Sequence, residues 1–235
     1  MDKKTYIAPH REVRLLLFIG YLIVLLFAAC VKGNDDSVPH TSNVMFYNAY
    51  NVADGVDFMI NGSKLQTGTV WRDSSSSYNQ VYSGTWDISA VTSSGSASNA
   101  LASINGDLSP GKYYSCFFAG PSSSPELLLV PDNLSAPDSA NRAKVRFFNL
   151  SASSGSVDMG VKDSTSLFSG YQYMKGGDYA LIDTSAHKLV VKSSGSAGVV
   201  LASIDFHAAS RRIYTFYLHD SLENKPVLSW KVYQR

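Results

Sequence analysis

The stretch SSGSASNALASI at residues 93–104 recurs as SSGSAGVVLASI at residues 193–204. A match 100 residues apart indicates an internal repeat, and a real repeat should bring back other landmarks at nearly the same spacing. The segment VMFYN, beginning at Val44, returns as VRFFN, beginning at Val145. Further matched landmarks are Val56-Asp57 with Val157-Asp158, Tyr78 with Tyr179, Val81 with Ile182, and Tyr114 with Tyr214. Each repeat is therefore expected to be one whole domain of about 90 residues.

Apolar and polar residues alternate within each repeat, as in strands that bury one face. The expected inner residues are Val56, Phe58 and Ile60 in VDFMING, Trp86, Ile88 and Ala90 in TWDISAV, and Leu228, Trp230 and Val232 in VLSWKVY. Asn61-Gly62 predicts a type I′ hairpin turn. Short strands between Gly, Ser and Asn turns indicate an all-β protein with two tandem antiparallel β-sandwich domains, immunoglobulin-like or transthyretin-like.

A stretch rich in Pro, Ser and Asp follows Pro131 and predicts the boundary between the repeats. The expected organisation is a leader at residues 1–29, a flexible tether at 30–42, a first sandwich at 43–133, a linker at 134–142 and a second sandwich at 143–235.

The amino terminus has the pattern of an export signal. A basic leader precedes the apolar run LLLFIGYLIVLLFAA, residues 15–29, which ends directly on Cys30. This run is shorter than the roughly 20 residues that span a bilayer comfortably. The sequence Ala28-Ala29-Cys30 resembles a relaxed lipobox of Bacteroidetes lipoproteins, in which cleavage leaves a lipid-bearing cysteine, although Phe27 stands where Leu is usual. The alternative is an uncleaved membrane helix.

Lipid attachment at Cys30 implies an exported protein held in the bacterial outer membrane, facing the periplasm or the cell surface. The leader holds four of the 20 basic and two of the 19 acidic residues, which leaves 16 basic and 17 acidic residues in the mature chain. A charge near −1 argues against nucleic acid as a partner, because phosphate binding requires a basic surface. The expected partners are the membrane, through the anchor, and a glycan or protein ligand.

Several segments carry a family resemblance. The segments VMFYN, VDFMING and LASINGDLSPGKYYSCFFAG, and then AKVRFFNLS and RRIYTFYLHD in the second repeat, resemble the domain of unknown function 4397 (DUF4397). The resemblance implies two tandem β-sandwich copies in a bacterial lipoprotein or secreted protein. The second copy departs from the pattern, with Lys162-Asp163 in place of the Asn-Gly turn. Because the family has no settled activity, the resemblance implies no catalytic residue.

Residues that could support catalysis or bind a metal are sparse. His187, His207 and His219 lack the spacing of metal ligands, and no GxSxG motif occurs. Asp57 and Asp158 hold equivalent positions in separate domains, so a structural role is expected for both. Catalytic residues, metals and cofactors are accordingly not expected. Cys116 matches Phe216 of the second repeat, which predicts a buried thiol.

Exposed aromatic residues are the remaining indication of a binding site, because sugars and protein partners stack on them. The candidates are Trp71 and Tyr78 in the first repeat and Tyr171 and Tyr173 in the second. The alternative is that these aromatic residues fold back over the sheet edges. Ser37 and Ser139 lie in Asp-Ser-Val and Asp-Ser-Ala, which resemble sites of bacterial O-glycosylation.

These observations favour a non-catalytic envelope lipoprotein that serves as a binding or structural module. One alternative is a polysaccharide-acting hydrolase or its accessory subunit. A hydrolase of this kind would need two carboxyl groups roughly 5–9 Å apart in one cleft. Another alternative is a purely architectural spacer. The oligomeric state is not indicated by the sequence.

Overall fold

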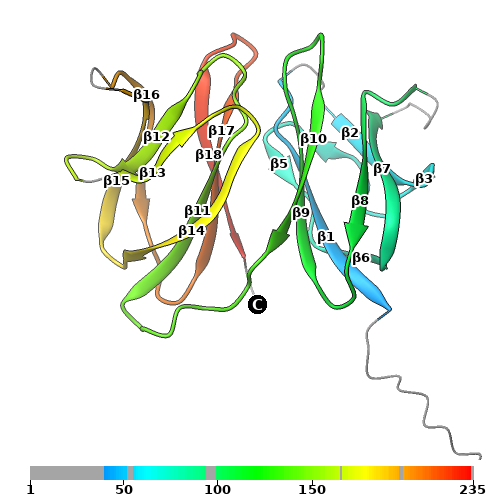
Figure 1. The fold of residues 1–235 in the computed structure, drawn as a ribbon, viewed down its shortest axis with the longest axis horizontal. Coiled ribbons are helices and arrows are strands. Elements are labelled where there is room, and N and C mark those ends of the chain that lie inside the picture. Colours follow the sequence, from blue (N-terminus) through cyan, green and yellow to red (C-terminus); the bar gives the residue numbers. More distant parts are fainter. Residues whose placement is uncertain (1–39, 52–54, 94–98, 165, 196–197, 234–235) are drawn as a thin grey trace, which may run out of the picture. The chain divides into compact units, whose positions relative to one another are not determined.

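Strands form the regular structure of the residues that the structure describes and pair there into four sheets (Figure 1). The computed structural model describes residues 40–51, 55–93, 99–164, 166–195 and 198–233, all within one compact unit, Pro39–Arg235. The predicted all-β class with two sandwich domains is confirmed. No membrane-spanning helix occurs in this part of the chain. The leader, Cys30 and Ser37 lie outside the described residues.

The first sandwich consists of sheets A and B. Its strands are β1 (Thr41–Asn48), β2 (Gly55–Ile60), β3 (Ser63–Lys64), β4 (Val70–Trp71), β5 (Ser74–Ser75), β6 (Asn79–Tyr82), β7 (Gly84–Thr92), β8 (Ala102–Leu108), β9 (Tyr113–Ala119) and β10 (Glu126–Asp132). Sheet A has the order β10-β9-β1-β5, with β6 also beside β1. Sheet B has the order β3-β2-β7-β8, with β4 beside β2.

The second sandwich repeats this arrangement in sheets C and D. Its strands are β11 (Arg142–Asn149), β12 (Val157–Val161), β13 (Ser166–Tyr171), β14 (Lys175–Asp183), β15 (Ala186–Ser193), β16 (Val200–His207), β17 (Ile213–Asp220) and β18 (Pro226–Tyr233). Sheet C has the order β14-β11-β17-β18 and sheet D the order β13-β12-β15-β16. Pairing is antiparallel as predicted, except that β1 pairs with β9 and β11 with β17 in parallel.

Each sandwich encloses its own apolar core. The predicted inner residues Val56, Phe58, Ile88, Ala90 and Leu228 are buried, and Ile60, Trp86 and Val232 are half-buried against the same cores. Asn61 and Gly62 have φ angles of 48° and 74°, as a type I′ turn requires. Trp230 is a partial exception to the predicted burial. Its ring contacts Phe206 and Tyr214 but remains 41% exposed, because β18 is the edge strand of its sheet.

A third apolar cluster joins the outer face of sheet A to the outer face of sheet C. Phe117 packs against Phe148 with ring centroids 4.8 Å apart, and Tyr47 packs against Tyr217 at 5.8 Å. The strand registers make Tyr47 equivalent to Phe148 and Phe117 equivalent to Tyr217. Each of these contacts is therefore the counterpart of the other, which is the signature of a two-fold contact. The two sandwiches pair as a pseudo-symmetric dimer within one chain.

Candidate functional site

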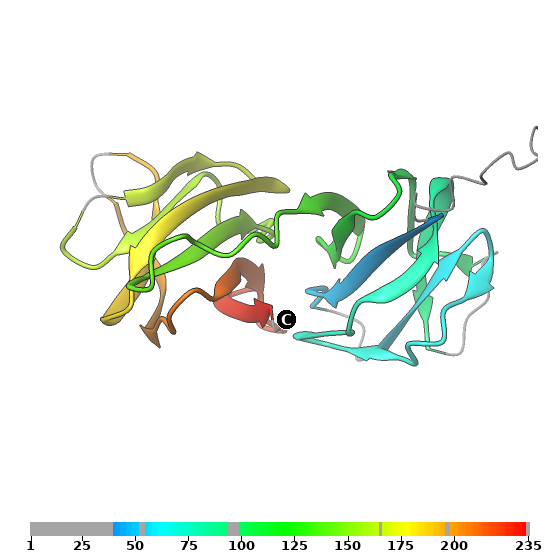
Figure 2. The same cartoon turned by 90° about the horizontal axis from the view of Figure 1, so that it is seen from below.

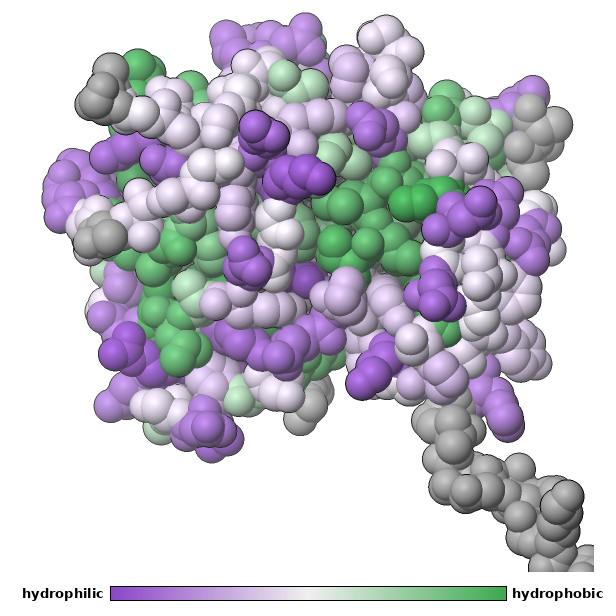
Figure 3. Space-filling view, viewed as in Figure 1, coloured by the Kyte–Doolittle hydropathy of each residue, from purple (hydrophilic) through white to green (hydrophobic). Residues whose placement is uncertain are grey.

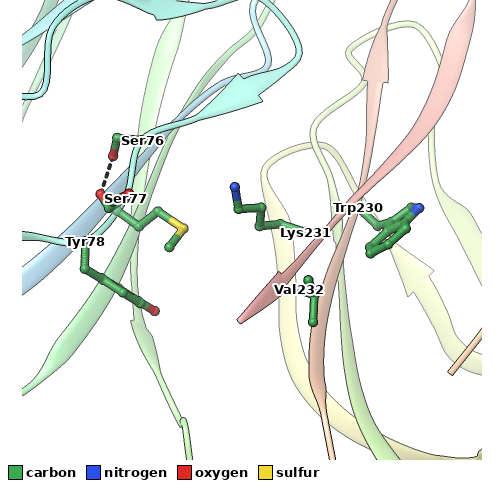
Figure 4. A pocket seen from close by; sticks show the side chains of 7 residues that line it. Ser76, Ser77, Tyr78, Trp230, Lys231 and Val232 are labelled. Carbon is green, nitrogen blue, oxygen red and sulfur yellow. Dashed lines mark hydrogen bonds between the residues drawn. The ribbon is translucent and has the colours of Figure 1, made fainter. Parts of the chain in front are cut away.

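A groove of about 390 Å³ lies where β18 approaches the first sandwich. Figure 2 shows β18, in red, beside that sandwich. The residues lining the groove are Met45, Ser76, Ser77 and Tyr78 from the first sandwich and Trp230, Lys231 and Val232 from β18. We call this the β6–β18 groove. Figure 4 shows Lys231 reaching from β18 toward Ser76 and Ser77, whereas Trp230 lies on the opposite side of the strand.

Hydrogen bonds fix the walls of the β6–β18 groove. The Ser76 hydroxyl accepts a bond from the amide of Phe46 at 3.0 Å and donates to the Ser77 carbonyl at 2.6 Å. The Tyr78 hydroxyl donates to Asp132 Oδ2 at 2.6 Å, and burial, followed by the Asp132 charge, raises the pKa of Tyr78 well above its usual value. Tyr78 is therefore a neutral, immobilised wall of the groove.

Lys231 gives the groove its charge. Its side chain is half-buried, and no carboxylate of the described residues forms an ion pair with it. An ammonium beside hydroxyl groups and an aromatic ring is a suitable site for a carboxylate or another anionic group.

A second groove, of about 700 Å³, occupies the opposite edge of the contact between the sandwiches. Tyr179 here takes the place of Tyr78, and its hydroxyl accepts a bond from the amide of Asn133 at 3.1 Å. Val130 is the counterpart of Lys231 by strand register. Val130 lies on the edge strand β10, over which Figure 3 shows an apolar surface. Val130 does not line the second groove, which instead has Lys112, Asn133 and Ser135 in its wall, so the two grooves are related in position but differ in lining.

A buried ion pair lies between the sandwiches. Arg146 Nη2 lies 2.6 Å from Asp132 Oδ1, and neither side chain is exposed. The guanidinium also donates to Ser115 at 2.9 Å, to the Tyr233 hydroxyl at 2.6 Å and to Thr215 at 2.8 Å. A buried charge is tolerated only when it is paired and hydrogen-bonded in this way. This cluster holds the sandwiches together and is closed to ligands.

The four predicted aromatic candidates do not form one cluster. Trp71, on β4, is 62% exposed and lies over Gly55. Tyr78 lines the β6–β18 groove. Tyr171 stacks on the Phe147 ring and donates a hydrogen bond to Asp178 at 2.8 Å, as in the folded-back alternative.

Tyr173 extends from the second sandwich to the first. Its hydroxyl is buried, and a Cβ placed on Gly120 would lie only 2.6 Å from that oxygen. Tyr173 therefore belongs to the contact between the sandwiches. Ser139 is exposed in the connector, where its hydroxyl accepts a bond from the Asn141 amide at 3.3 Å.

The two repeated aspartates are engaged in structural hydrogen bonds, as predicted. Asp57 pairs with Lys64 at 2.5 Å and accepts a bond from Thr69 at 2.8 Å. Asp158 accepts bonds from the Gly170 amide at 2.7 Å and the Ser194 hydroxyl at 2.6 Å. In the described ranges, no three His, Cys, Asp or Glu side chains converge as metal ligands would.

The predicted burial of Cys116 is confirmed, since its side chain is fully enclosed. Desolvation raises the pKa of this thiol to about 12, so it is neutral at physiological pH. His187 sits half-buried at the sandwich rim, with Nε2 2.9 Å from Asp183 Oδ1.

Sequence reasoning missed Lys231 and Arg146. The available signal for Arg146 was a charge inside VRFFN, an otherwise apolar run that could be buried on both faces. Lys231 gave no comparable signal, because alternation alone places it on an ordinary solvent face of its strand.

The fold defines a two-domain β-sandwich protein with grooves at the edges of the contact between its domains. The chain belongs to the family described as Domain of unknown function (DUF4397), whose model matches residues 42–160. The match covers the first sandwich and ends within β12, so a second family copy stays a prediction. No curated protein matches the chain.

Solved structures with some likeness to this chain include proteins of Bacteroides and Eubacterium. A candidate cell adhesion protein of Bacteroides uniformis is 10% identical, with a TM-score of 0.24, and the match covers 85% of this chain and 99% of that one. A CBM26 module of Eubacterium rectale in complex with maltoheptaose is 11% identical, with a TM-score of 0.26 and coverage of 83% and 97%. A DUF3823 protein of Bacteroides ovatus is 10% identical, with a TM-score of 0.22 and coverage of 74% and 98%. Likeness at this level carries no information on function.

Proposed function

We propose that this chain is an exported, non-catalytic lipoprotein, anchored through Cys30, whose paired sandwiches bind an extracellular ligand in the β6–β18 groove. The basic leader and the apolar run that ends on Cys30 support export and anchoring. The observation that carries the binding role is Lys231, a half-buried cation facing an open groove without a carboxylate partner among the described residues.

The chemistry of the groove favours a ligand with an acidic group. Lys231 supplies the charge, the Ser77 hydroxyl is exposed beside it, and the Tyr78 ring provides an apolar wall. A glycan with carboxylate groups combines these requirements, because its hydroxyls and acid groups match polar side chains while its ring faces match aromatic ones. Protein ligands with acidic side chains are the second class to screen.

The arrangement of carboxylates supports a non-catalytic role. Asp57 and Asp158 belong to separate sandwiches, and each is engaged by a hydroxyl and a further donor of its own sandwich. The hydrolase alternative needs two carboxyl groups with room for a glycosidic bond between them. Asp57 and Asp158 are instead each held by donors of their own sandwich, which supports the non-catalytic role.

A binding screen with the full-length chain in detergent tests the groove. We expect wild-type protein to bind carboxylated glycans and Lys231→Gln to bind them about tenfold to a hundredfold more weakly, because a charged hydrogen bond is lost. Lys225→Gln is the matched control, since Lys225 lies on the same hairpin, is exposed and pairs with Glu223 at 2.6 Å. Binding that survives Lys231→Gln but is lost in Trp71→Ala would move the site to β4. No binding to any carboxylated glycan or acidic protein would favour the architectural spacer.

Proteinase treatment of intact cells tests the anchor and its orientation. If Cys30 is lipidated, the Cys30→Ala variant is released from the membrane fraction while the wild type is retained. Digestion of the wild type in intact cells places the sandwiches at the cell surface. Protection until the outer membrane is opened places them in the periplasm. An intact mass that matches the lipid-bearing chain without sugar would exclude glycosylation of Ser37 and Ser139.

A further inference from the structure

The pseudo-two-fold contact between the sandwiches is not symmetric in charge. The strand registers make Met45 of β1 equivalent to Arg146 of β11, since Met45 pairs with Ser115 and Arg146 with Thr215. The same registers make Asp132 equivalent to Tyr233, the last residues of β10 and β18. The first sandwich thus contributes Met and Asp to the contact, and the second contributes Arg and Tyr.

Only the pairing of a first sandwich with a second sandwich gives each buried charge an opposite charge as partner. In the chain as folded, Arg146 meets Asp132 at 2.6 Å, while Met45 and Tyr233 share the apolar cluster. Two first sandwiches paired through this face would bury two Asp132 carboxylates without a cation. Two second sandwiches would bury two Arg146 guanidinium groups without a carboxylate. A buried charge without a partner is strongly destabilising, so both like pairings are disfavoured.

We infer that the outer faces of sheets A and C form a heterotypic interaction surface, whose partner is the other repeat and never a copy of the same one. Met45, Asp132, Arg146 and Tyr233 are the residues that determine this specificity. The surrounding rings are alike in the two repeats, with Tyr47 and Phe117 on one face and Phe148 and Tyr217 on the other, and supply affinity to either pairing. Specificity comes from the unpaired Asp132 or Arg146 charges that a like pairing would bury at the centre of the contact.

An exchange of the four residues between the repeats tests this inference in the full-length chain. The half-exchanged variant, Arg146→Met with Tyr233→Asp, gives both sandwiches Met and Asp. We expect its ratio of paired to unpaired molecules to fall on the order of a hundredfold, seen as a larger radius of gyration in small-angle scattering. The fully exchanged variant adds Met45→Arg with Asp132→Tyr and restores one arginine and one aspartate across the pseudo-two-fold axis.

We expect the fully exchanged variant to recover most of the compact, wild-type scattering profile, although it differs from the wild type at more positions than the half-exchanged one. Near-ultraviolet circular dichroism shows whether the individual sandwiches are folded. A fully exchanged variant as expanded or unfolded as the half-exchanged one would overturn the inference. A half-exchanged variant that pairs like the wild type would also overturn it.

Discussion

Replacing Asp132 by asparagine removes one charge of the buried pair while almost preserving its shape. Arg146 would keep its hydrogen bonds to Ser115 and Thr215 but would lose the carboxylate 2.6 Å away. Both side chains have no exposed surface, so solvent cannot compensate the guanidinium. Breaking a buried pair by removing one partner costs about 3–5 kcal/mol. For a chain of this size, that loss lowers the melting temperature by roughly 10 °C.

Urea denaturation followed by circular dichroism measures the loss. Asp87→Asn is the matched control, because Asp87 is an exposed aspartate of β7, and its free energy of unfolding should change by less than about 0.5 kcal/mol. The double variant Asp132→Asn/Arg146→Met should be more stable than Asp132→Asn alone, because it leaves no unpaired buried charge. A loss below about 1 kcal/mol for Asp132→Asn would refute the reasoning.

Three further predictions concern residues away from this pair. Burial lowers the pKa of His219 despite nearby acidic groups, so the unfolded state binds the proton at a higher pH than the folded state does. The free energy of unfolding should therefore fall as the pH drops below about 6.5. The urea midpoint of His219→Gln should change less between pH 7.5 and 5.5 than the urea midpoint of the wild type. Gly176→Ala should lower the free energy of unfolding by about 2–4 kcal/mol, because φ is +140° and a Cβ would lie 2.2 Å from the Phe147 carbonyl oxygen. The control Gly155→Ala, at φ +66° in open space, should lower it by about 1 kcal/mol in the same urea denaturation. In a Cys30→Ala chain, Cys116 is the sole thiol and should react with a thiol reagent only after unfolding; fast labelling of the native protein would contradict its burial.

The repeat and the inner faces of the strands were predictable because each depends on local pattern. Alternation identified Val56 and Phe58 as core residues, and the Asn61-Gly62 dipeptide identified its turn. These features depend on period-two geometry and on φ angles that few residues adopt. Neither requires knowledge of residues distant in sequence.

The contact between the sandwiches does not follow from the sequence pattern, because alternation predicts a single buried face for every strand. The segment YYSCFFA of β9 is nearly continuous in apolar residues and is buried on both faces. Such a run is typical of strands in parallel pairs, and β9 pairs with β1 in parallel. The same reading of β17, IYTFYLHD, would have indicated that both sandwiches cover their outer faces.

The candidate site was predicted only in part. Tyr78 is one of the aromatic candidates from the sequence, and it lines the β6–β18 groove. Its hydroxyl, however, donates a hydrogen bond to Asp132. Lys231 was missed, since its position in the groove depends on residues more than 150 positions earlier in the chain. Tyr173 is a ligand-contact candidate from the sequence, and the structure places it against Gly120 in the contact between the sandwiches. Sites built between domains follow from domain packing, which local pattern does not encode.

The distance between the two sandwiches tests whether they pair as described. Both the β6–β18 groove and the inferred specificity of the contact depend on this pairing. Asp107 of β8 and His207 of β16 are exposed and 100 residues apart, so Asp107→Cys and His207→Cys can carry nitroxide labels in a Cys30→Ala chain, where Cys116 is buried. Pulsed electron paramagnetic resonance should then give one narrow distance distribution, which broadens when Asp132→Asn is added. A broad distribution in the chain without that substitution, as from two sandwiches moving independently on a flexible connector, would contradict the account.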